Sequence, residues 1–70
     1  MIEKERLKQF GELVYFITNN KSRTIELINW AILDEKRIQK MMNFLNNNQT
    51  ATYSQIQYQM SLIVAEEEMQ

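Results

Sequence analysis

The sequence predicts an all-α protein of three helices in an antiparallel arrangement: a long helical hairpin followed by a third, C-terminal helix. Apolar residues recur three and four positions apart along most of the chain, which is the period of an amphipathic helix. The chain has no proline and one glycine, so few residues interrupt a helix. Its 70 residues suffice for one small domain, which we expect to span residues 1–70.

The first predicted helix covers about residues 2–18. Gly11 lies at the edge of its apolar stripe, where it either permits close approach of another helix or is simply tolerated. The polar run of residues 18–24 then forms a short helix–helix connection. The stripe itself consists of Leu7, Phe10, Val14 and Ile17.

The second predicted helix covers about residues 24–46, and one carboxylate interrupts its apolar seam. Asp34 occupies the seam position midway along this helix. It either fixes the register or oligomeric state of a helix pair, or reaches water, Arg37 or an arginine of the first helix where the stripe frays. Leu33 and Phe44 lie on the opposite side, where an isolated hairpin leaves them exposed. The seam consists of Leu27, Ala31, Ile38, Met41 and Leu45.

The third segment is ambiguous between helix and strand over residues 53–64, where apolar and polar residues nearly alternate. Thr52 and Gln55 match a capping box, and no other segment alternates, so a strand lacks a partner within the chain. We therefore predict a helix over about residues 52–67. Such a helix is apolar on two faces, the second formed by Tyr58, Leu62, Ala65 and Met69.

Charge is unevenly distributed along the chain, although the net charge is only −1. All eight basic residues precede residue 41 and are interleaved with acids, so a general phosphate-binding face is not favoured. Residues 66–68 are three consecutive glutamates, which we interpret as a solubilising end of a fraying helix in preference to a docking motif.

No charged residue occurs from Met42 to Ala65, a stretch that favours aggregation if it is exposed. One face of each helix is buried in a three-helix monomer, and the second face of the last helix then needs another cover. We therefore expect an oligomer, specifically a homodimer, with a different protein as a further possible partner.

Several functional classes are excluded or not favoured. The chain has no histidine or cysteine, which removes ordinary zinc sites, disulfides and the usual base for a nucleophile. We expect no catalytic activity, no metal and no cofactor. The charged N-terminus and the lack of a long apolar window predict neither secretion nor a membrane span, so the expected location is cytoplasmic.

These observations favour a small, non-catalytic α-helical interaction or regulatory protein that forms a homodimer. The abundance of Asn, Lys, Ile and Gln is typical of an AT-rich bacterial or phage genome. Trp30 is either an aromatic anchor or a core residue. The predicted interface residues are Trp30, Leu33, Asp34, Phe44, Tyr58 and Leu62.

The alternative is a truncated helix-turn-helix DNA-binding regulator. Phe44-Leu45, a polar loop and then residues 52–56 resemble the way winged-helix regulators enter their second helix. The resemblance covers only this short stretch and implies a DNA-reading helix. The stretch lacks the lysines and arginines that such a helix uses on phosphates and base edges.

Overall fold

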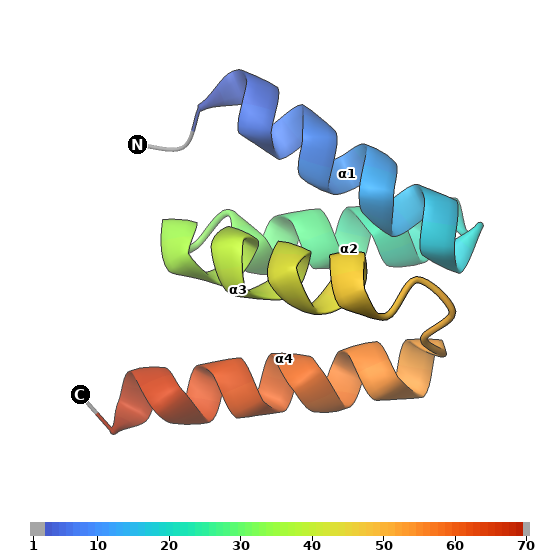
Figure 1. The fold of residues 1–70 in the computed structure, drawn as a ribbon. Helices are drawn as coiled ribbons and strands as arrows, with labels where there is room; N and C mark the ends of the chain where they lie inside the picture. Colours follow the sequence, from blue (N-terminus) through green and yellow to red (C-terminus); the bar gives the residue numbers. More distant parts are fainter. Residues whose placement is uncertain (1–2, 70) are drawn as a thin grey trace.

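The computed structural model describes residues 3–69, and over these residues it is all-helical with no strand. Consecutive helices run in opposite directions, and α2 and α3 lie between α1 and α4 (Figure 1). The all-α prediction is confirmed, but the described chain has four helices in place of three. They are α1 (Lys4–Thr18), α2 (Lys21–Ala31), α3 (Glu35–Asn47) and α4 (Tyr53–Glu68).

The connection between α1 and α2 is built from two adjacent asparagines. Asn19 ends α1 in the left-handed conformation at φ 48°, which Asn tolerates better than most residues. Asn20 caps α2, because its side-chain oxygen accepts a 3.0 Å hydrogen bond from the Arg23 backbone N–H. The Thr24 hydroxyl donates to the Asn20 carbonyl at 2.8 Å. The helix therefore begins earlier than the predicted residue 24.

The predicted continuous helix over residues 24–46 is wrong, because the chain breaks between Ala31 and Glu35. Asp34 is the N-cap of α3, in extended conformation, and its carboxylate accepts a 2.9 Å hydrogen bond from the Lys36 backbone N–H. This position gives the carboxylate a donor and the positive end of the helix dipole, whereas a seam position would bury its charge. Asp34 is thus not a helix-seam residue.

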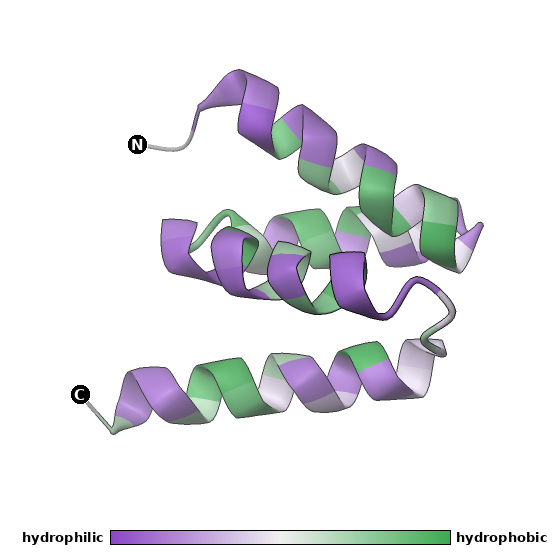
Figure 2. Cartoon of the chain, in the orientation of Figure 1, coloured by the Kyte–Doolittle hydropathy of each residue, from purple (hydrophilic) through white to green (hydrophobic). Residues whose placement is uncertain are grey.

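The break also allows two short helices to share one core. A continuous helix of the predicted length would extend about 34 Å at 1.5 Å per residue, whereas the longest dimension of the described molecule is 33 Å. Folding back at residues 32–34 lets Leu27 and Ala31 of α2 and Ile38 of α3 face the same interior. The hydrophobic colour on α1 likewise lies mostly toward α2 and α3 (Figure 2).

The helical prediction for the last segment is confirmed. The Thr52 side chain accepts from the Gln55 N–H at 3.2 Å, and the Gln55 side-chain oxygen accepts from the Thr52 N–H at 2.8 Å. This reciprocal capping box fixes the start of α4.

All four helices contribute to one apolar core. Among the described residues, no buried side-chain nitrogen or oxygen lacks a hydrogen-bond partner. No described helix is long and apolar enough to cross a membrane. The buried hydrophobic residues are Phe10, Val14, Leu27, Ala31, Ile38, Met41, Leu45, Ile56 and Ile63.

Candidate functional site

The outer face of α4 is an uncovered apolar stripe, formed by Tyr58, Leu62 and Ala65 and continued by Met69, the C-cap residue of the helix. Tyr58 is 66% exposed, Leu62 41% and Met69 86%, and Ala65 is also exposed. These residues follow the four-three-four spacing of a helix-pairing seam. The core side of the same helix carries Ile56 and Ile63, which are buried. α4 is therefore apolar on two sides, of which this chain covers one.

Tyr58 and Phe44, both predicted interface residues, are brought together. They line one shallow depression of about 420 Å³ between α3 and α4, together with the amide side chains of Asn48, Gln55 and Gln59. Phe44 itself is half-buried and packs against the core. This depression continues the outer face of α4 at Tyr58.

Leu33 lies apart from this surface. It sits in the turn between α2 and α3 and is 74% exposed, next to the capping residue Asp34. The helix break separates Leu33 from Phe44, so they do not share one face of one helix as the sequence predicted.

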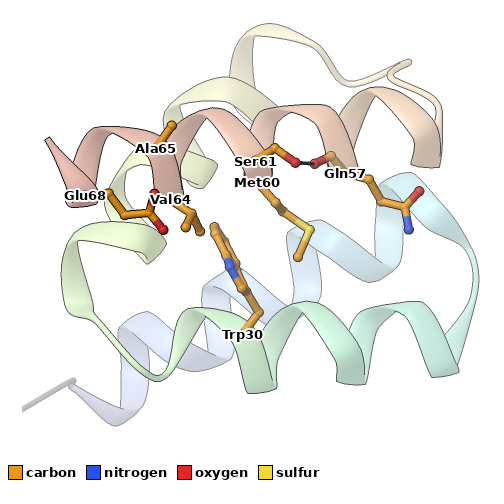
Figure 3. A pocket seen from close by; sticks show the side chains of 7 residues that line it. All are labelled: Trp30, Gln57, Met60, Ser61, Val64, Ala65 and Glu68. Atoms are coloured by element: carbon orange, nitrogen blue, oxygen red, sulfur yellow. Dashed lines mark hydrogen bonds between the residues drawn. The ribbon is translucent and has the colours of Figure 1, made fainter.

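Trp30 is a half-buried residue of α2, and its side chain extends toward α4 (Figure 3). It lines a shallow open groove of about 490 Å³ with Met60 and Val64 of α4. Figure 3 shows its indole pointing from α2 toward α4, between these two side chains. Trp30 therefore contributes to the packing of α4 on α2.

Arg37 of α3 contacts both Trp30 of α2 and Glu67 of α4. Its guanidinium lies 5.0 Å from the centre of the Trp30 ring and donates a 3.0 Å hydrogen bond to the Trp30 carbonyl. Its Nε donates to both carboxylate oxygens of Glu67, at 2.8 and 3.1 Å. The hydrogen bond to Glu67 is the main cause of a raised pKa of Arg37; desolvation opposes it, and the charges of Glu67 and Asp34 add to it.

The acidic end of the chain is thus not only a solubilising tail. Besides Glu67, Glu66 accepts a 2.7 Å hydrogen bond from the Lys40 ammonium. α4 continues to Glu68 without fraying over the described residues. Two of the three glutamates therefore attach the end of α4 to α3.

A second polar contact lies at the opposite end of α4. The Tyr53 hydroxyl donates a 2.7 Å hydrogen bond to the Glu26 carboxylate, and the Arg23 guanidinium lies 4.3 Å from the centre of the Tyr53 ring. Burial, and then the hydrogen bond to and charge of Glu26, raise the pKa of Tyr53, while the Arg23 charge lowers it. Both ends of α4 are therefore tied to the body of the protein.

Sequence reasoning missed a second apolar surface, the α1–α2 groove. This open groove of about 500 Å³ is lined by apolar atoms of Leu7, Gly11, Tyr15 and Ile28, with charged residues of α1 at its rim. Ile25 and Ile32 lie about one helical turn before and after Ile28 and are 51% and 49% exposed. In the sequence, the three-four spacing of these isoleucines is the pattern that indicates an apolar surface on this side of α2.

Over residues 3–69 no group of three or more His, Cys, Asp or Glu side chains could hold a metal ion. α4, which the helix-turn-helix alternative would place against DNA, contains no lysine or arginine and carries three glutamates at its end. The geometry therefore adds nothing in favour of DNA reading.

Comparisons with known proteins do not assign the chain to a family: no protein-family model, curated protein or solved structure matches it.

Proposed function

We propose that this chain is a small, non-catalytic α-helical interaction protein of bacterial or phage origin, which acts in the cytoplasm as a homodimer joined through the outer face of α4. The observation that carries the proposal is the uncovered apolar stripe of Tyr58, Leu62, Ala65 and Met69.

The composition of α4 supports a protein partner for this stripe. No charged residue occurs from Met42 to Ala65, so most of the stripe is flanked by uncharged polar side chains. A contiguous apolar strip with polar flanks is typical of a protein interface and, left bare, promotes aggregation. A second copy covers both stripes at once, because a twofold interface pairs the same surface of each protomer.

The first test is molar mass by light scattering over a concentration series. We expect the wild type to be a dimer at micromolar concentrations and Leu62→Glu to be a monomer with unchanged helical circular dichroism. A carboxylate buried without a partner costs several kcal/mol, so the dimer Kd should rise by about 100-fold or more.

Ile25→Glu is the matched control. It places the same charge on an exposed apolar residue of α2, about one helical turn before Ile28 of the α1–α2 groove. We expect this variant to stay dimeric. A monomeric wild type at all concentrations would contradict the homodimer, and dissociation by Ile25→Glu alone would move the interface to the α1–α2 groove.

A further inference from the structure

We infer that the two α4 helices of the dimer pair antiparallel, in a register that places Tyr58 opposite Met69 of the second copy and Leu62 opposite its Ala65. This inference rests on the proposed function and goes further, because it specifies how the second copy binds. Two features of α4, the sizes of the stripe residues and the position of its acids, support it independently.

The sizes of the stripe residues favour the antiparallel register. In that register each large Leu62 faces a small Ala65, and this layer occurs twice around the twofold axis. A parallel pair in register instead sets Ala65 against Ala65, which leaves a gap, and stacks Leu62 on Leu62 beside it. Alternation of large and small residues across an interface fills space better than layers of equal residues.

The acids favour the same direction. Glu66 and Glu68 lie on opposite flanks of the stripe at the C-terminal end of α4. Parallel pairing brings Glu66 of one copy beside Glu68 of the other on both flanks, and like charges in contact are destabilising. Antiparallel pairing sets Glu66 beside Gln59, and Glu68 beside Gln57 and Ser61. Lys40 reduces the repulsion through its 2.7 Å contact with Glu66, but Glu66 stays largely exposed.

The chain has no cysteine, so introduced thiols report the pairing direction without interference. Tyr58→Cys and Met69→Cys chains are mixed in equal amounts, left to exchange under native conditions and oxidised with glutathione. Intact mass then distinguishes the mixed disulfide from the two symmetric ones. The same mixture oxidised in urea gives the distribution for random collision.

In the antiparallel register, position 58 of one copy lies level with position 69 of the other. The two copies of position 58 are then about 16 Å apart along the axis at 1.5 Å per residue, too far for a disulfide. We expect the ratio of the mixed disulfide to each symmetric product to be several-fold higher in the native sample than in the sample oxidised in urea.

Each other result overturns the inference in a recognisable way. An excess of both symmetric products shows parallel pairing, and an excess of only one of them shows antiparallel pairing in a different register; both results leave the homodimer standing. The urea distribution under native conditions, combined with a dimeric wild-type mass, places the interface away from α4. The same distribution with a monomeric wild-type mass overturns the proposed function as well.

Discussion

The Arg37 guanidinium and the Glu67 carboxylate join α3 to the end of α4 through two hydrogen bonds at 2.8 and 3.1 Å, with side chains only 14% and 24% exposed. Because Arg37 also contacts Trp30 of α2, its loss leaves a poorly hydrated carboxylate and an unpaired carbonyl. We expect Arg37→Met to lower the free energy of unfolding by about 1–3 kcal/mol. Urea denaturation at a fixed chain concentration measures this change.

Lys40→Met is the matched control for that experiment. It removes the neighbouring contact between α3 and α4, but the Glu66 side chain is 60% exposed. Exposed ion pairs contribute about 0–1 kcal/mol, so the free energy of unfolding of this variant should stay close to that of the wild type. If the two variants lose the same free energy of unfolding, the Arg37–Glu67 contact contributes no more than an exposed ion pair.

The N-cap role of Asp34 gives a second prediction. Asp34→Asn keeps a side-chain oxygen that accepts from the Lys36 N–H, so we expect it to retain most of the stability. Asp34→Leu removes that acceptor and should cost about 1 kcal/mol. Thermal unfolding followed by circular dichroism tests both. If Asp34→Leu instead stabilises the protein, the helix break is contradicted. The predicted continuous helix, with Asp34 in its apolar seam, is then favoured.

The start of α4 was predictable because its signal is local. Thr52 and Gln55 form the capping box within one turn, and the helix follows without any tertiary information. The outer face of α4 was predictable for the same reason: the spacing of Tyr58 and Leu62 fixes their side of the helix once the helix is known.

The break at Asp34 was not predictable by periodicity. Leu27 and Ala31 of α2 and Ile38 of α3 keep the same heptad phase, and neither glycine nor proline marks the turn. The α1–α2 groove was missed because it depends on how two helices pack. Tyr15 lies off the stripe of α1, and only the neighbouring Ile28 makes it part of an apolar surface.

Tyr53 gives a prediction for alkaline pH. Its pKa is raised in the folded protein, chiefly by burial and then by its contact with Glu26. A raised folded pKa means that this contribution to stability is complete below the unfolded pKa, near 10, and is lost as pH rises through the folded pKa. We therefore expect the wild type to lose more stability than Tyr53→Phe above about pH 10.

Urea unfolding at pH 8 and above pH 10 provides the comparison, with Tyr15→Phe as the control for an exposed tyrosine outside the proposed dimer interface. Tyr53→Phe should flatten the alkaline decline. If stability declines equally in Tyr53→Phe and the wild type, the pKa of Tyr53 is the same in the folded and unfolded states.

Gly11 gives the last prediction, which concerns the packing of α1 on α2. A Cβ at this position would lie 3.1 Å from the Cδ1 of Ile28, the end of a flexible side chain beside an open groove. That methyl group has room to move, so the helix preference of alanine over glycine, about 1 kcal/mol, should prevail. We expect Gly11→Ala to raise the free energy of unfolding by up to about 1 kcal/mol, and Gly11→Leu to lower it by about 1–3 kcal/mol through overpacking. Denaturation in urea measures both, and a loss of stability in Gly11→Ala would show that Ile28 is held too firmly for the helices to accept even one methyl group.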